Sequence, residues 1–315
     1  GNALVVGARA ENSSATGVDG NQAGLAAPSS GAAYVFRRTG SDWVQEAFLK
    51  ASNTGTADLF GSAVVLSGDR VAVGAPQESG GGSGTSGDPS DNSVSGAGAV
   101  YVFARSGASW SPEAYLKASR AGARDLFGSA LAMVGDTLMV GAPGESARVS
   151  GVNGSDDNDD APRSGAAYRF SRRDGAWSAP DFLKAANTGA GDEFGAAVAV
   201  MEPWLVAGAF REDGGPSGDG LDDSASDAGA AYVFSMAPPA GLLTIREIAF
   251  TGSTLRLSLA LTPGQSVGIE YSESGPGGPW LDLGLLPNLE GLGTFEETDP
   301  VRAGRAIGYY RAVLR

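Results

Sequence analysis

The sequence predicts an all-β protein, with a β-propeller of four-stranded antiparallel blades over residues 1–237 and a small β-sandwich over residues 243–315. Three observations lead to this fold class. A unit of 67 residues recurs through the first part, each complete unit contains four short strand-like runs, and from Pro238 the repeat gives way to other short alternating runs. No stretch of the chain has the periodicity of an amphipathic helix.

The repeat is defined by positions that return every 67 residues without a gap. These are the Phe-Gly pair at Phe60, Phe127 and Phe194, the Tyr-x-Phe run at Tyr34, Tyr101 and Tyr168, and the Leu-Lys pair at Lys50, Lys117 and Lys184. The repeats cover about residues 1–57, 58–124, 125–191 and 192–237, and the long loop of the fourth is three residues shorter. Units of this size cannot bury an apolar face alone, so they stack or form a ring.

The second repeat shows the expected order of the strands. Residues 60–67 alternate small and apolar side chains, and a Gly-Asp turn joins them to a β-branched run at 70–73, which predicts a hairpin. A polar loop at 77–98 leads to a third strand at 99–104. A Ser-Gly turn then leads to an outer fourth strand at 110–118. Four antiparallel strands in each repeat are typical of a propeller blade.

The strand count predicts that the propeller is incomplete. The first repeat begins at its second strand and the last ends after its third, so we expect fourteen strands, or about three and a half blades. A propeller closes its ring to hide the edges of its sheets, and fourteen strands cannot do so. We therefore expect residues 1–237 to be the C-terminal part of a larger propeller, in which strands from distant repeats complete one shared blade.

The sequence after the repeats is predicted to form a separate domain. A linker rich in Pro and Gly, at 238–242, precedes six short alternating runs. These runs lie at residues 243–250, 254–261, 266–271, 280–285, 294–297 and 307–313. Six or seven short strands separated by Gly, Pro, Ser and Asn turns predict a small β-sandwich.

The composition excludes several kinds of chemistry. The 315 residues contain no Cys and no His, which excludes disulfides, thiol nucleophiles, imidazole bases and Cys/His metal sites. The net charge of −14 disfavours nucleic acid and anionic membranes as partners. The sequence contains no run of 18 apolar residues, so no membrane-spanning helix is predicted. Because Gly1 lies inside a repeat, we expect that an upstream part with an export signal has been removed.

Several of these motifs resemble the FG-GAP repeat of integrin alpha-chain β-propellers, in the form found in bacterial surface proteins. The resemblance covers about residues 1–235 and rests on Phe60-Gly61, Gly74-Ala75-Pro76, the run 98–103 and Leu116-Lys117-Ala118. The segment with Trp280-Leu281-Asp282 and Tyr309-Tyr310 resembles, more loosely, the fibronectin-type-III-like modules of secreted bacterial proteins. The resemblance implies a seven-bladed extracellular propeller for adhesion or ligand binding, often with calcium in its loops. The Asp-x-Asp-x-Asp-Gly sequence of integrin calcium loops is not intact here.

The long loop between the second and third strands of each repeat is the candidate calcium site. A glutamate stands at the same phase in every loop, and aspartates follow it. Calcium prefers six to eight hard oxygen ligands from a flexible loop. The candidate ligands are Glu78, Asp88, Asp91, Glu145, Asp156, Asp157, Asp159, Glu212, Asp219, Asp222 and Asp223. The alternative is a set of solvated acidic connectors, and the first loop, with Glu11 and few other acids, is the poorest candidate.

Three further sets of repeated residues have a structural and a functional interpretation. The aspartate before each Phe, such as Asp58, is expected to bond turn amides, with metal ligation as the alternative. The tryptophan of each repeat, such as Trp110, is expected to pack between blades rather than to stack on a sugar. The lysine of the Leu-Lys pair, such as Lys117, is expected to bury its aliphatic stem and keep its amine at the rim rather than to bind an anion.

Adhesion or ligand binding is the function that these features favour, with an unidentified protein or carbohydrate at the cell surface as partner and calcium as cofactor. An enzyme would have to use paired carboxylates, as in glycoside hydrolysis. A catalytic pair occurs once, whereas the acids here recur in every repeat. We therefore expect a non-enzymatic module. The alternatives are a structural spacer in a secreted multidomain protein and a carboxylate-based glycosidase, and the differences among the four loops favour binding over a spacer.

Overall fold

The computed structural model describes residues 1–214 and 224–235, together with six strands between residues 244 and 314. The chain divides into an N-terminal region, Gly1–Ser235, and a C-terminal region, Met236–Arg315. Every element in the described residues is a β-strand, and these residues include no helix that could cross a membrane. The all-β prediction is therefore confirmed.

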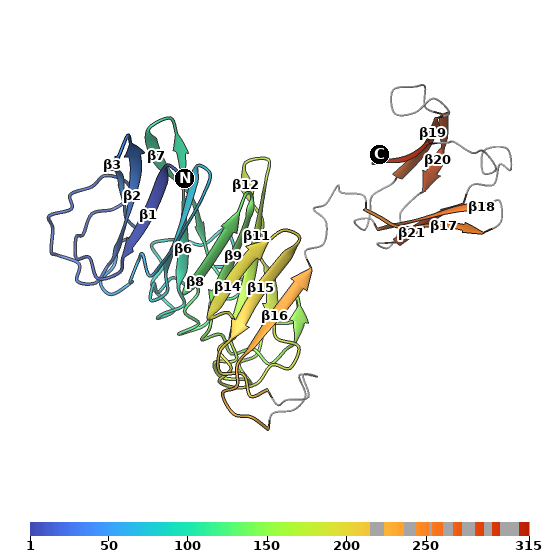
Figure 1. Cartoon of the computed structure of the whole chain (residues 1–315). Coiled ribbons are helices and arrows are strands. Elements are labelled where there is room, and N and C mark those ends of the chain that lie inside the picture. Colours follow the sequence, from blue (N-terminus) through green and yellow to red (C-terminus); the bar gives the residue numbers. More distant parts are fainter. Residues whose placement is uncertain are drawn as a thin grey trace. The chain divides into compact units, whose positions relative to one another are not determined.

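The described residues of the N-terminal region form four antiparallel sheets, one for each repeat (Figure 1). The first sheet contains β1 (Ala3–Ala8), β2 (Ala32–Thr39) and β3 (Asp42–Leu49); the second contains β4 (Ala63–Ser67), β5 (Arg70–Ala75), β6 (Ala99–Ser106) and β7 (Ser109–Leu116). The third contains β8 (Ala130–Val134), β9 (Thr137–Ala142), β10 (Gly151–Val152), β11 (Ala166–Arg173), β12 (Ala176–Trp177) and β13 (Asp181–Lys184). The fourth contains β14 (Ala197–Met201), β15 (Trp204–Ala209) and β16 (Ala230–Ser235).

The strands pair in the predicted order, with two local differences. The inner strand of the second repeat begins at Ala63, because Phe60 forms an isolated parallel bridge with Gly31 of the preceding repeat. In the third repeat the outer strand is divided into β12 and β13, and Pro180 between them cannot donate to a ladder. The loop strand β10 pairs with β13. The described part of this region thus has sixteen strands rather than the fourteen expected.

Apolar side chains fill the space between successive sheets. One cluster joins the first and second sheets and includes Val35, Phe60 and Tyr101, and a second joins the second and third sheets and includes Val102 and Phe127. The Phe of each Phe-Gly pair is fully buried and meets aromatic rings edge-on, as Phe60 does with Tyr101 at 5.4 Å between ring centroids. The predicted core role of this position is confirmed.

The repeated tryptophans are buried between two sheets in the repeats that follow another repeat. Trp110 and Trp177 are 6 and 8 % exposed and belong to the clusters between sheets. Trp43, in the first repeat, is 45 % exposed because the described structure places no earlier repeat against it. The prediction of packing between repeats is confirmed for Trp110 and Trp177.

The glycines of the repeat bring the backbones of neighbouring repeats into direct contact. A Cβ added to Gly74 at the end of β5 would lie 2.0 Å from the carbonyl oxygen of Gly128, and one added to Gly141 would lie 1.9 Å from that of Gly195. The Phe-Gly pair of one repeat therefore rests against the end of the second strand of the repeat before it. No side chain fits at this contact.

Ion pairs also join neighbouring repeats at the outer strands. A β-bulge in the pairing of β6 with β7 leaves Glu113 without a partner residue across the ladder. The Glu113 carboxylate pairs with Arg70 of its own repeat at 2.9 Å and with Arg172 of the next at 2.8 Å. Glu46 lies at the same bulge in the first repeat and pairs with Arg105 at 2.8 Å. The bulge thus turns a carboxylate towards the following sheet.

The C-terminal region has two three-stranded antiparallel sheets, with strand orders β17-β18-β21 and β20-β19-β22. Their strands are β17 (Thr244–Thr251), β18 (Thr254–Ala260), β19 (Val267–Ser272), β20 (Leu281–Leu286), β21 (Leu292–Glu296) and β22 (Tyr309–Leu314). All six predicted runs are strands. The predicted linker at 238–242 lies outside the described residues. The β-sandwich and its likeness to fibronectin type III remain predictions.

Candidate functional site

A buried lysine–glutamate pair, here called the Lys–Glu pair, lies at the base of the long loop in each of the first three repeats. The chain has only three lysines, and each follows the Leu at the end of an outer strand. Each pairs with the glutamate 39 residues before it, Lys50 with Glu11 at 2.8 Å, Lys117 with Glu78 at 2.8 Å and Lys184 with Glu145 at 2.7 Å. The lysine side chains are at most 1 % exposed.

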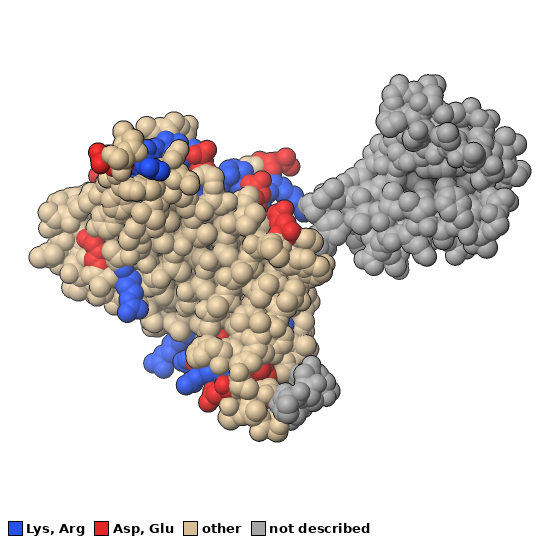
Figure 2. All heavy atoms as spheres, in the orientation of Figure 1, with Lys and Arg blue, Asp and Glu red and all other residues tan. Residues whose placement is uncertain are grey.

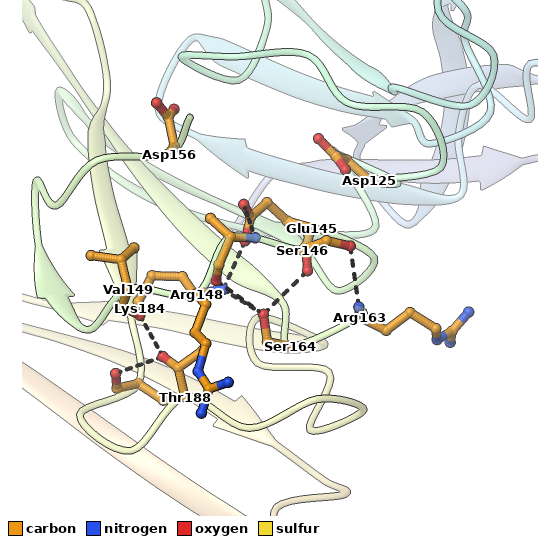
Figure 3. A network of polar contacts seen from close by, with 12 residues as sticks. Asp125, Glu145, Ser146, Arg148, Val149, Asp156, Arg163, Ser164, Lys184 and Thr188 are labelled. Carbon is orange, nitrogen blue, oxygen red and sulfur yellow. Dashed lines mark hydrogen bonds and ion pairs between the residues drawn. The ribbon is translucent and has the colours of Figure 1, made fainter. Parts of the chain in front are cut away.

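The third repeat shows how the pair fixes the loop (Figure 3). Lys184 Nζ donates to Glu145 Oε2 and to Ser164 Oγ, each at 2.7 Å. The other oxygen of Glu145 accepts a hydrogen bond from the backbone N–H of Ala147 at 2.8 Å. The lysine therefore ties the outer strand to both ends of the loop, because Glu145 stands at its beginning and Ser164 at its end.

The first two repeats use the same geometry with different neighbours. Lys50 Nζ donates to the carbonyl oxygen of Gly31 at 2.7 Å and to Ser30 Oγ at 2.8 Å. Lys117 Nζ donates to the carbonyl oxygen of Gly98 at 2.6 Å. Glu78 also accepts from the Tyr115 hydroxyl at 3.0 Å. The pair is thus a repeated structural unit within this chain and not a feature of one loop.

Burial makes each charge of the pair dependent on the other. Burial raises the pKa of Glu145, against the opposing effect of the Lys184 charge, and it lowers the pKa of Lys184, against the opposing effect of the Glu145 charge. Removing one member of such a pair leaves an uncompensated buried charge, which is strongly destabilising. The Lys–Glu pair therefore holds the base of the loop rigid as long as both residues are present.

The predicted position of the lysine amine at the rim is wrong. The amine is buried with its stem, because a carboxylate and backbone oxygens meet it inside the sheet edge. The sequence carries a signal for this pairing: the constant spacing of 39 residues between the loop glutamate and the next lysine in the first three repeats. That signal is easily missed, because charged residues are expected at the surface.

The aspartates of the second loop are engaged within their own loop. Asp88 is exposed and accepts hydrogen bonds from the N–H and the hydroxyl of Ser90, and the first of these bonds lowers its pKa most. Asp91 accepts from the backbone N–H groups of Gly81 at 2.9 Å and Ser93 at 2.8 Å. Glu78 is buried at the base of the loop, paired with Lys117. The three candidate ligands of this loop thus serve its internal turns and its anchor.

The third loop shares its acids with the repeat before it. Asp156 accepts from Ser119 Oγ at 2.6 Å, and Asp159 pairs with Arg120 at 3.0 Å. Ser119 and Arg120 follow β7 of the second repeat, so these contacts join neighbouring repeats on the loop side. Asp157 is exposed and bonds the hydroxyl of Ser155.

The described carboxylates do not fit a calcium site as they stand. Calcium needs several oxygen atoms around one point, and the described residues contain no group of three acidic side chains that could hold a metal ion. Glu212 is described and buried in the fourth repeat, whereas Asp219, Asp222 and Asp223 lie outside the described residues. Calcium binding therefore stays a prediction without support from the geometry.

The aspartate before each Phe-Gly pair bonds a turn amide, as predicted. Asp58, Asp125 and Asp192 accept from the N–H groups of Gly55, Gly122 and Gly189 at 2.7–2.8 Å. Asp58 is only 8 % exposed, and burial, reinforced by the charge of Glu78, raises its pKa from 3.8 to about 6. Because the pKa of Asp58 is higher in the folded protein than in the unfolded chain, the protonated carboxyl contributes its full stability below the ordinary pKa of 3.8. That contribution is lost as the pH rises through about 6.

Asp58→Asn is therefore expected to stabilise the protein at neutral pH. The asparagine keeps an oxygen acceptor for Gly55 but carries no charge to bury. The gain in the free energy of unfolding is expected to reach up to about 3 kcal/mol at pH 7 and to vanish near pH 4. Urea unfolding of both proteins at a series of pH values measures it, with Asp42→Asn at the exposed start of β3 as control. A gain that does not change with pH would contradict the buried charge.

The surface of the N-terminal region carries both signs of charge close together. Figure 2 shows Lys and Arg atoms beside Asp and Glu atoms near the two ends of the strands, with a largely uncharged surface between them. No field of one sign covers this face. This face therefore offers no extended charged surface of one sign that would attract a highly charged partner.

Comparison with a protein-family model relates these repeats to a known family. A family model described as the FG-GAP repeat matches three segments, residues 43–103, 110–170 and 177–234, which together make up more than half of the chain. Each segment runs from the outer strand of one repeat to the third strand of the next. The search of curated proteins found no match.

Proposed function

The chain belongs to the FG-GAP repeat family, and from that membership we propose that it is a non-enzymatic β-propeller module that binds a ligand outside the cell. FG-GAP repeats are typical of extracellular or cell-surface proteins. The four sheets are then blades of a seven-bladed ring, and the long loops lie together on one side of it, because each joins a second strand to a third. A protein or carbohydrate at the cell surface is the proposed partner.

The observation that carries this proposal is the contrast between the constant base and the varied tip of the loops. The Lys–Glu pair holds the base at the same place in three repeats. Beyond it, the second loop is rich in Gly and Ser, whereas the third gathers four aspartates within residues 156–160. Rigid scaffolds that present variable loops are a common basis of recognition. A spacer would have no use for such differences, and it is the second candidate.

Contacts between the second and third long loops and the connection before each of their repeats also support recognition by the loop side. The third loop reaches back to Ser119 and Arg120 at the end of the second repeat. Asn53, which follows the outer strand of the first repeat, donates to Glu78 in the second at 3.1 Å. The second and third loops are therefore each tied to the chain that follows the preceding outer strand, and a segment that is held in place loses less conformational entropy on binding.

The proposal is tested with the fluorescently labelled full chain against a panel of surface polysaccharides and extracellular proteins. We expect binding to at least one member. Replacing residues 88–93 and 155–160 with Gly and Ser of equal length should weaken that binding at least about tenfold. The matched control replaces the β6–β7 turn at residues 107–108, at the opposite end of the sheet. A folded protein that binds no member, or binds equally well without the loop residues, would favour the spacer.

Calcium as a cofactor is tested separately by thermal melting in chelator and in 10 mM calcium. A site with a dissociation constant of about 1 mM would add about 1.4 kcal/mol to the free energy of unfolding. Replacing Asp156, Asp157 and Asp159 with Asn should abolish the gain if the third loop binds the ion. Glu145 is left in place, because its loss would break the Lys–Glu pair with or without calcium. Equal melting temperatures in both buffers would contradict calcium binding.

A further inference from the structure

The fourth repeat has the glutamate of the Lys–Glu pair but no lysine for it. Glu212 occupies the position of Glu11, Glu78 and Glu145 and is 2 % exposed. Its Oε1 accepts a hydrogen bond from Asn187, whereas its buried Oε2 has no hydrogen-bond partner among the described residues. Such an oxygen carries the full cost of leaving water. A buried carboxylate oxygen without a donor indicates that a partner is missing.

The frame around Glu212 is already built as in the complete repeats. The N–H of Gly229 donates to the carbonyl oxygen of Glu212 at 2.9 Å, as Gly98 does to Glu78 at 2.8 Å. The Tyr232 hydroxyl bonds Asn187 at 2.6 Å, which repeats the bond of Tyr101 to Asn53 in the second repeat. Two contacts that surround the pair in the second repeat are therefore present in the fourth, whereas no described strand brings a lysine to it.

The strand that brings the lysine is the outer one, and none of the described strands occupies its place in the fourth repeat. In the first three repeats the lysine follows or ends the strand that pairs with the third strand of the sheet, namely β3, β7 and β13. In the fourth, β16 pairs with β15 alone among the described strands. The next strand in the chain, β17, pairs with β18 in the C-terminal region. No lysine follows Lys184 in the sequence.

The electrostatics of Glu212 fit a missing cation. Burial raises the pKa of Glu212, the Tyr232 hydroxyl opposes this rise, and the charge of Asp192 adds to it. In the first repeat burial acts in the same direction, but the hydrogen bond and charge of Lys50 and the two hydrogen bonds from Ser13 together lower the pKa of Glu11 below its ordinary value. An ammonium group placed beside Glu212 would therefore supply the donor for Oε2 and offset the neighbouring negative charge.

We propose that the edge of β16 that no described strand pairs with, together with the carboxylate of Glu212, forms a binding site for the lysine-bearing outer strand of a further FG-GAP unit. The backbone of that strand continues the sheet beyond β16, and its lysine ammonium pairs with Glu212 Oε2 and with the carbonyl oxygen of Gly229. Main-chain bonds give such strand addition its affinity, and the side-chain pocket gives it specificity. The site needs only the geometry of the fourth sheet and exists whether or not the loops bind a ligand.

The test uses a fluorescein-labelled peptide with the sequence of residues 109–118, SWSPEAYLKA, which contains β7 and Lys117. Fluorescence anisotropy measures its affinity for the full chain. A second peptide carries methionine in place of the lysine, and a third has the same composition in scrambled order. We expect the lysine peptide to bind at least about tenfold more tightly than the methionine peptide, because only the first supplies the charge. The scrambled peptide should not bind.

Variants of the protein locate the site. Glu212→Gln is expected to remove the preference, so that the lysine and methionine peptides bind with similar affinity. Glu202→Gln makes the same change at an exposed carboxylate of the same repeat and should leave the preference intact. The comparison of peptides on the unaltered protein does not depend on the folding of any variant. Equal affinities for the two peptides, or no binding of the lysine peptide, would overturn the proposal.

Discussion

Gly141→Ala is expected to destabilise the N-terminal region by about 3 kcal/mol or more, whereas Gly208→Ala is expected to be nearly neutral. The two glycines hold the same place in successive repeats. A Cβ on Gly141 would lie 1.9 Å from the carbonyl oxygen of Gly195, a backbone atom that cannot move without separating two sheets. A Cβ on Gly208 would find its nearest neighbour at 3.7 Å, because no described repeat lies against it.

Urea unfolding of both variants measures the difference. Because alanine restricts the unfolded chain more than glycine does, Gly208→Ala is expected to raise the free energy of unfolding by no more than about 1 kcal/mol. Comparing Gly141→Ala with Gly208→Ala thus distinguishes the stability lost at the contact between repeats from the ordinary effect of adding a methyl group to a strand. Similar losses at both positions would mean that these glycines serve their own sheets rather than the contact between sheets.

The sequence predicts the repeat and its strands because these depend on local patterns. Alternation along residues 70–73 and 99–104 marks two strands of the second sheet, and the Phe of each Phe-Gly pair is identified as core by its recurrence. The division of β12 from β13 is less visible. It follows from Pro180, which occupies the position of Glu113 at the bulge of the preceding repeat.

The contacts between repeats and inside the loops could not be predicted in the same way. The glycine of Gly-Ala-Pro indicates a turn, but the carbonyl oxygen that excludes its Cβ belongs to the next repeat. Glu78 and Glu145 look like ligands because acidic loops favour cations, and the cation that they meet is a lysine of their own repeat. A charge pattern alone does not tell a buried partner from a dissolved ion, since both satisfy the same carboxylate.

Lys184→Met is expected to cost about 3–5 kcal/mol of folding free energy at neutral pH, because it leaves Glu145 buried without its counter-charge. Methionine fills a similar volume, so the loss reports the charge rather than a cavity. The sign of the pH dependence follows from the glutamate. Burial already raises the pKa of Glu145, and loss of Lys184 removes an effect that opposes this. A carboxyl with a raised pKa is tolerated when protonated, so the cost should shrink as the pH falls towards 4.

The matched control for this variant is Arg37→Met, which removes a cation from a partly exposed ion pair. Arg37 is 34 % exposed, and its partner Glu46 keeps Arg105 at 2.8 Å. Its loss is expected to cost no more than about 1 kcal/mol. Thermal and urea unfolding of both variants between pH 4 and pH 8 gives the comparison, and adding Glu145→Gln to Lys184→Met should recover part of the loss, because the orphaned charge is then gone. If Lys184→Met costs no more than Arg37→Met and does not depend on pH, the Lys–Glu pair does not hold the loop.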